Sequence, residues 1–191
     1  MIEIIAIIGV IGLGLFALIV LLVFAGVYNN FKSLENKIEN AEAQIDVQLK
    51  KRYDLVPNLV ETVKGYATHE KETLKKVTQA RASAANAKGI DEKAQANNML
   101  TDALKSLFAV VEAYPNLKAN KNFLMLQEEL SGIENKIAYA RQFYNDLVME
   151  YNTKREKIPS NIVASMFHFE EKKYFEAPEE ENIQKAPEVK F

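Results

Sequence analysis

Residues 4–27 read IIAIIGVIGLGLFALIVLLVFAGV, twenty-four consecutive residues that are all apolar or glycine. Glu3 is the only charged residue before them. As an α-helix the stretch would be about 36 Å long, because each residue adds about 1.5 Å. That length crosses a hydrocarbon core of about 30 Å with some tilt. The sequence therefore predicts a membrane-spanning helix over residues 4–28, preceded by a short N-terminal segment, residues 1–3.

The alternative interpretation of this stretch is a cleavable signal peptide. A signal peptide has a basic N-terminal region and an apolar core of about 7–15 residues. This chain begins Met1-Ile2-Glu3 and its apolar run is longer, so a retained anchor is favoured. Basic residues such as Lys32 and Lys37 follow the run and none precedes it. Under the positive-inside rule we expect a single-pass cell-membrane protein with residues 1–3 outside and the soluble domain in the cytoplasm.

The composition excludes several classes of function. The 24 basic and 26 acidic side chains give a net charge of −2, so we expect no nucleic-acid partner. The absence of cysteine excludes disulfides, thiolate metal sites and a cysteine nucleophile. The residues that follow the apolar stretch suffice for one compact domain.

Apolar residues recur every three or four positions through most of the remaining chain, which is the pattern of amphipathic helices. Directly after the apolar stretch they form one stripe that contains Phe31, Leu34, Ile38, Ala41 and Ile45. Proline disfavours helix in the residue before it. We therefore expect the first helix to end near Arg52, ahead of Pro57, and a second to begin with Asp54 as its cap. Gly89 suits the left-handed turn after that second helix, and Pro115 is expected to close the third.

A fourth helix, ending before Pro159, keeps its apolar residues in a sustained alternation of three and four. Long helices joined by short connections favour an antiparallel bundle. The predicted fold class is therefore all-α: the transmembrane helix continues into a four-helix, up-down bundle with coiled-coil-like packing over residues 29–158. The short apolar segment 159–176 either docks on the bundle or lies at the membrane interface. Residues 177–191, rich in Glu and Pro, are expected to be a disordered tail.

No stretch carries a catalytic signature. The two histidines, His69 and His168, stand far apart, and neither a zinc-protease helix nor a nucleophile elbow is present. We therefore expect no enzyme activity, catalytic residue, metal or cofactor. Charged residues on or beside the apolar stripes are better explained as pairs that meet across the bundle and select its register. These candidate structural residues are Asp46, Arg52, Asp54, Glu70, Arg81, Glu134 and Arg141.

Two blocks of sequence resemble the signature of the LemA family. Residues 44–60 read QIDVQLKKRYDLVPNLV, and residues 114–120 read YPNLKAN. With shorter matches the resemblance covers residues 28–176. It implies an N-terminal membrane helix, a bundle of long helices and no established catalytic activity. Some members carry a lipid-modified cysteine where this chain has Val27, so lipid anchoring is not implied.

The resemblance also implies a role at the membrane. Relatives include a magnetosome membrane component, and family members are often encoded beside a membrane metalloprotease. Our leading hypothesis is a membrane-anchored scaffold, expected to be a homo-oligomer, that self-associates or docks partners to organise or remodel a membrane region. The alternative is an accessory subunit of a membrane protease or signalling system. The candidate docking surface for that alternative comprises Lys50, Lys51, Arg52, Tyr53, Pro57 and Asn58.

Overall fold

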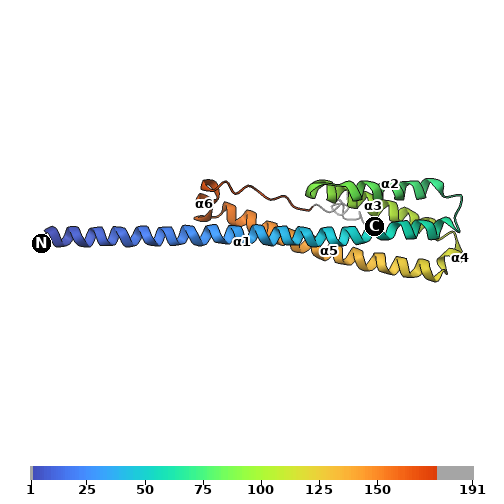
Figure 1. Ribbon diagram of the computed structural model, residues 1–191, viewed down its shortest axis with the longest axis horizontal. Helices are drawn as coiled ribbons and strands as arrows, with labels where there is room; N and C mark the ends of the chain where they lie inside the picture. Colours follow the sequence, from blue (N-terminus) through green and yellow to red (C-terminus); the bar gives the residue numbers. More distant parts are fainter. Residues whose placement is uncertain (1, 176–191) are drawn as a thin grey trace, which may run out of the picture. The chain divides into compact units, whose positions relative to one another are not determined.

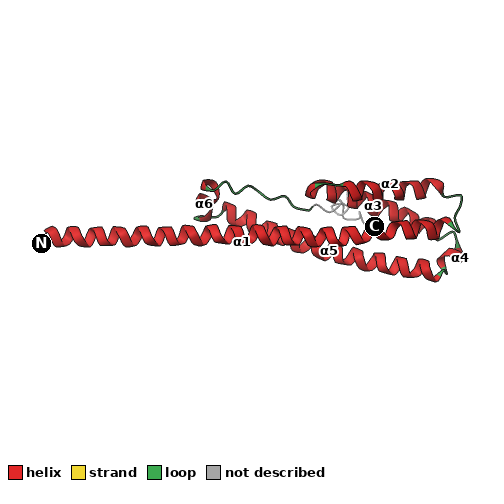
Figure 2. Cartoon of the chain, in the orientation of Figure 1, coloured by secondary structure: helices red, strands yellow, loops and turns green. Residues whose placement is uncertain are grey.

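The computed structural model describes residues 2–175, and these residues form helices and no strand (Figures 1 and 2). In chain order the helices are α1 (Ile2–Lys64), α2 (Lys71–Asn86), α3 (Gly89–Val111), α4 (Pro115–Lys118), α5 (Lys121–Glu156) and α6 (Ser160–Met166). The predicted all-α class is confirmed, whereas the four-helix, up-down order stays a prediction. The expected tail, residues 177–191, lies outside the described residues.

The apolar stretch forms the first part of α1. Within the described chain α1 is the one helix long and apolar enough to cross a membrane, with a mean hydropathy of 3.1 in its most apolar window. Most of the large apolar side chains described there are exposed, from 37% at Val20 to 72% at Leu13, whereas Phe24 and Val27 are half-buried. A helix that is apolar all round and uncovered by protein fits a lipid environment. The side of the membrane on which the later helices lie stays a prediction.

The expected break between Arg52 and Pro57 is wrong, because α1 continues without interruption to Lys64. Pro57 has no N–H to donate to the carbonyl of Tyr53, four residues earlier, which is one reason that proline disrupts helices. Arg81 of α2 supplies a donor instead, since its Nε donates to the Tyr53 carbonyl oxygen at 2.9 Å. A side chain from a neighbouring helix thus completes the hydrogen bonding of α1 at its proline.

Two other expected helix boundaries are also wrong. A turn at residues 65–70 divides the second expected helix, so that its first part belongs to α1 and the rest is α2. Gly65, a poor helix former, begins this turn. Asp54 lies inside α1 and caps no helix. Pro115 does not close α3, which ends at Val111; it is the first residue of α4, where a missing N–H leaves no helical bond unmade.

The described chain divides into two compact units. The first comprises residues 2–42 and Phe143–Lys173, and the second comprises Ala43–Gln142 with residues 174–175. Helices α1 and α5 each contribute one part to each unit. The domain limits expected from the sequence, with one bundle over residues 29–158, stay a prediction.

Aromatic rings dominate the core of the first unit. Phe31 of α1 is fully buried, meets Tyr151 of α5 edge-on with ring centroids 5.4 Å apart, and stacks on Phe169 at 4.7 Å. Leu34 and Ile38, on the predicted stripe of α1, are also buried. This core clamps α1 against α5 and the segment that follows α6.

Gly89 starts α3 with a φ of 72°, in the left-handed region predicted for it.

The core of the second unit draws apolar residues from five helices. The most deeply buried members of the core are Val56, Leu59 and Val63 of α1, Val77 of α2, Leu100 and Leu107 of α3, Leu117 of α4 and Phe123 of α5.

The role of Arg81 can be tested by a double-mutant cycle with Pro57. Arg81→Met removes the donor to the Tyr53 carbonyl and should cost about 1–3 kcal/mol of unfolding free energy. In a Pro57→Ala background the backbone N–H restored at this position can take over, so the same change should cost about 1 kcal/mol less. Urea unfolding of the full chain in mild detergent, followed by circular dichroism, measures both. Equal costs in the two backgrounds would contradict the assignment.

Candidate functional site

A buried arginine joins three helices of the second unit. Arg52 of α1 is 4% exposed. Its Nη1 donates a hydrogen bond to Asn97 Oδ1 of α3 at 2.6 Å, and its Nη2 forms an ion pair with Glu134 Oε2 of α5 at 2.8 Å. Asn97 is itself buried, with 2% exposure. The guanidinium therefore ties both α3 and α5 to one point on α1.

The surroundings of Arg52 indicate a structural role for this charge. Burial lowers the pKa of the guanidinium, the negative charge of Glu134 raises it, and nearby Arg141 lowers it. Arginine is the most basic of the ionisable side chains, so Arg52 stays charged at neutral pH and serves no acid-base purpose there. A register that left this cation unpaired would be costly. The site therefore selects one packing of the helices.

The remaining five candidate structural residues meet partners outside their own set. Four of these contacts join separate segments of the second unit, and the Lys50 contact lies on the exposed surface of α1. The contacts are Asp46 with Lys93 Nζ (2.8 Å), Asp54 with Lys50 Nζ (2.7 Å), Glu70 with the Tyr114 hydroxyl (3.1 Å), Arg81 with the Tyr53 carbonyl (2.9 Å) and Arg141 over the Phe175 ring (5.8 Å).

The candidate docking surface is not one continuous exposed patch. Lys50, Lys51, Pro57 and Asn58 are exposed and Tyr53 is half-buried, but the Arg52 side chain is buried and already paired. Including Arg52 in an open surface was therefore wrong. Its long cationic side chain sits on the inner face of α1, where its neighbours in sequence do not point.

Two of these residues, Lys50 and Tyr53, line a cleft of about 320 Å³. Ala84 and Ala85 of α2 and Lys93 of α3 form the opposite wall. The small alanine side chains leave this space open. The cleft gives the exposed part of the docking surface a concave site that a partner's side chain could enter.

A second cleft, of about 530 Å³, lies between the end of α1 and α2. Val60 and Leu74 form part of its floor, and Lys64, Lys71 and Lys75 are among its rim residues. The sequence interpretation missed this cleft because it treated the two walls as parts of one helix. Gly65, inside that supposed helix, was the signal for the turn.

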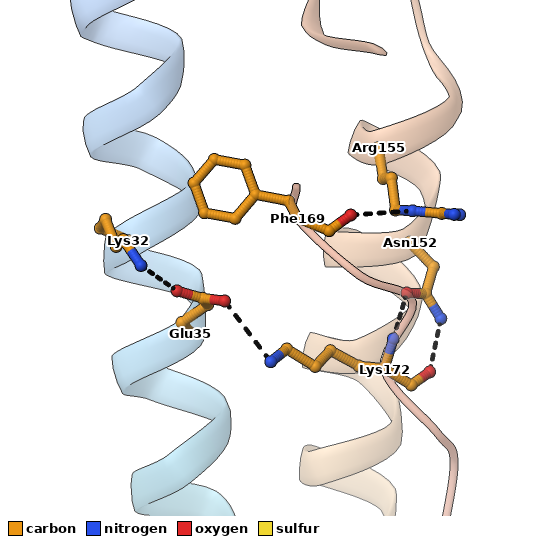
Figure 3. A network of polar contacts seen from close by, with 6 residues as sticks. All are labelled: Lys32, Glu35, Asn152, Arg155, Phe169 and Lys172. Atoms are coloured by element: carbon orange, nitrogen blue, oxygen red, sulfur yellow. Dashed lines mark hydrogen bonds and ion pairs between the residues drawn. The ribbon is translucent and has the colours of Figure 1, made fainter. Parts of the chain in front are cut away.

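In the first unit, the segment after α6 is fastened to α1 and α5 by polar contacts (Figure 3). Asn152 donates to the Lys172 carbonyl at 2.8 Å and accepts from the Lys172 N–H at 3.0 Å. Arg155 Nε donates to the Phe169 carbonyl at 3.1 Å. Glu35 of α1 pairs with Lys172 Nζ at 3.4 Å. We call Glu35, Asn152, Arg155, Phe169 and Lys172 the clasp.

The sequence interpretation did not identify the clasp. Its α5 side chains bond backbone groups 14 and 20 residues further on, and its α1 side chain pairs with the distant Lys172 side chain; no periodic pattern specifies such contacts. The apolar cluster around Phe167 and Phe169 was the available signal. It predicted either docking on the bundle or a place at the membrane interface, without identifying the residues contacted.

Tyr151 lies at the centre of the first unit. Its side chain is fully buried and its hydroxyl has no hydrogen-bond partner among the described residues. Burial, assisted by the negative charge of Glu35, raises the pKa of Tyr151 to about 12. The phenol is therefore neutral throughout the physiological range. It acts as a packing group.

Residues 2–175 contain no cluster of three His, Asp or Glu side chains arranged to hold a metal ion. The geometry thus defines an all-helical protein with one candidate membrane-spanning helix, whose charged groups hold helices in register and whose surface carries open clefts.

The chain belongs to the LemA family, whose family model matches residues 41–191. It is 30% identical over 166 residues to Protein LemA of Metamycoplasma hominis, covering 84% of this chain and 74% of that protein. It is 24% identical over 175 residues to Magnetosome protein MamQ 2 and to MamQ 1 of Paramagnetospirillum magneticum, covering 78% of this chain and 64% of each of those proteins. None of these names is that of an enzyme.

Removing the buried cation tests its structural role. Arg52→Met leaves the Asn97 carbonyl and Glu134 without this partner and should cost about 2–4 kcal/mol of unfolding free energy. The expected cost stays below that of breaking a fully buried pair because the Glu134 side chain is 37% exposed. Lys136→Met, an exposed change on the same helix as Glu134, should stay within about 0.5 kcal/mol. Urea unfolding in detergent compares the two, and equal stabilities would refute the structural role.

Proposed function

We propose that this protein is a non-enzymatic, membrane-anchored helical scaffold that self-associates or docks partner proteins, and thereby organises or remodels a region of membrane. The observation that carries the proposal is α1. One uninterrupted helix supplies both the exposed apolar stretch and the buried stripes around which the later helices pack. The anchor and the later helices are therefore connected through α1 itself.

Charged groups that pair between helices, and open clefts beside them, support a role in binding. Arg52, Glu134 and Asp46 hold helices together, and the two clefts lie on the surface of the second unit. Such an arrangement presents a stable shape to other molecules. The magnetosome proteins among the relatives are consistent with a scaffold at a membrane.

The proposal includes an orientation and a helix order. Lys32 and Lys37 follow the apolar stretch and no basic residue precedes it, so residues 1–3 lie outside and the later helices lie in the cytoplasm. In the second unit, α1, α2, α3 and α5 run in up-down order. The short connections at residues 65–70 and 87–88 support antiparallel neighbours.

A second candidate function is that of an accessory subunit, for example of a membrane protease, with the bundle as docking surface. The cleft beside Lys50 and Tyr53 specifically favours this role, because it lies in the exposed part of the candidate docking surface. The two roles differ in what occupies that surface: another copy of the chain in the first, and a different membrane protein in the second.

Mass and crosslinking together test the proposal. Light scattering of the full chain in mild detergent should give particles that are multiples of 21.6 kDa and dissociate on dilution. In membranes, a photo-crosslinker in place of Lys50 should capture a second copy more efficiently than one in place of Lys105. The two lysines are matched, with side chains 66% and 74% exposed.

The outcomes separate the two roles. A mass of 21.6 kDa at every concentration, with Lys50 crosslinked to a different membrane protein, would replace self-association by the accessory role. A monomer with no crosslink at Lys50 above the level at Lys105 would refute both.

A further inference from the structure

Helix α6 has one face docked on the protein and one face left open. Val163 and Ala164 are 1% and 3% exposed, and the hydroxyl of buried Ser160 donates to the carbonyls of Lys154 and Lys157. On the opposite side, Ile162 and Met166 are 52% and 57% exposed. The helix is thus anchored by its inner face and presents apolar side chains outward.

Apolar residues at both ends extend the open side. Ile158, before α6, is 82% exposed, and Phe167, after it, is 48% exposed. We call Ile158, Ile162, Met166 and Phe167 the α6 apolar face. The helix itself contains no charged residue. Four large apolar side chains exposed together on one short element form the kind of patch that soluble proteins usually cover.

The α6 apolar face lies at the end of the apolar stretch of α1. The ring centroid of Phe167 is 4.8 Å from that of Tyr28, the residue directly after Val27. Phe169 also contacts Tyr28, at 5.7 Å, and stacks on Phe31. Since residues 4–27 span about 36 Å and the hydrocarbon core about 30 Å, Tyr28 falls at the membrane–water interface. Aromatic residues are enriched at that level.

The clasp holds α6 beside Tyr28, at the end of the apolar stretch. The Arg155 side chain holds the Phe169 carbonyl, and Asn152 holds the backbone of Lys172, so the chain leaving α6 is tied to α5 (Figure 3). Phe169 points its ring toward α1 near Lys32, whose Nζ is 5.2 Å from the ring centroid. The element that carries the α6 apolar face therefore has a defined position on α1.

Basic groups surround this position. Lys154 and Arg155 lie in the last turn of α5, exposed Lys157 follows, and Lys154 Nζ hydrogen-bonds Asn30 Oδ1 near the start of the polar part of α1. Basic groups beside a membrane anchor attract the anionic headgroups of lipids. Acidic residues lie there too, namely exposed Glu156, Glu170 and Glu171, of which Glu171 lies 3.9 Å from Arg155 Nη1.

We propose that the α6 apolar face inserts into the lipid interface beside the α1 anchor, as a second membrane contact of this chain. The inference rests on the membrane anchoring within the proposed function. Lipid is the occupant that the geometry requires, because a bilayer around residues 4–27 already reaches the residue that Phe167 contacts. The short amphipathic helix and the anchor then bind the same membrane at two points, which fixes the tilt of the protein against it.

Spin labels at single cysteines test the inference, since the natural chain has no cysteine. The full chain is reconstituted in nanodiscs of phosphatidylcholine mixed with phosphatidylglycerol. Labels are placed separately at Ile162, Met166, Leu15 and Met149. Met149 is the matched control for Met166, because it is 54% exposed, lies in the same unit and sits on α5 close to the Phe31–Tyr151 contact, further from the apolar stretch. The measured quantity is each label's accessibility to oxygen relative to a water-soluble nickel chelate.

The inference predicts a shift of this ratio at Ile162 and Met166 away from the value at Met149 and toward that at Leu15. Ratios at Ile162 and Met166 equal to that at Met149, with a lipid-like ratio at Leu15, would overturn the inference and leave the anchor intact. A water-like ratio at Leu15 would overturn the anchor and the inference together. Circular dichroism of each labelled variant confirms that the helices are retained.

Discussion

The structure depends on the continuity of α1 as a single helix. A 63-residue helix can carry both a membrane span and the centre of a folded domain only if nothing interrupts it. Pro57 is the one place inside it where the backbone loses a hydrogen-bond donor, and there Arg81 donates to the carbonyl of Tyr53. A contact from α2 thus stabilises α1 at its proline. The end of α1 supplies Val63 and Leu59 to the core. Without this bond we expect α1 to kink at Pro57 and move these two residues out of the core.

Along this helix the side chains change environment in steps. The first part is apolar all round and uncovered by protein, as suits lipid. At Tyr28 and Phe31 aromatic contacts bring in the segment after α6. Further on, the apolar residues narrow to a stripe that the other helices cover, and Arg52 places a single paired charge on the inner face. Buried charge is weak evidence of stability. Here it joins three helices at one point, which accounts for a register that an apolar stripe alone would leave free to slip.

Some features could be predicted from the sequence because their physics is local. The uninterrupted run of apolar residues and the stripe of Phe31, Leu34 and Ile38 follow from composition and period, as does the left-handed Gly89. The helix through Pro57 could not be predicted, since the donor that permits it comes from a residue 28 positions away. The burial of Arg52 could not be predicted either, because its partners Asn97 and Glu134 are distant in the sequence. Its neighbours Lys50 and Lys51 are exposed. The clasp depends on backbone carbonyls, which no side-chain pattern reports.

Hydrogen–deuterium exchange of the full chain in nanodiscs tests whether one continuous helix joins the apolar stretch to the domain. We expect peptides covering residues 24–34 and 50–62 to exchange slowly, with no rapidly exchanging segment between the apolar stretch and the turn at Gly65. Fast exchange confined to residues 28–33 would reveal a flexible joint directly after the apolar stretch. Fast exchange confined to residues 52–58 would show that Arg81 does not sustain the helix through Pro57. Either result would refute a continuous α1.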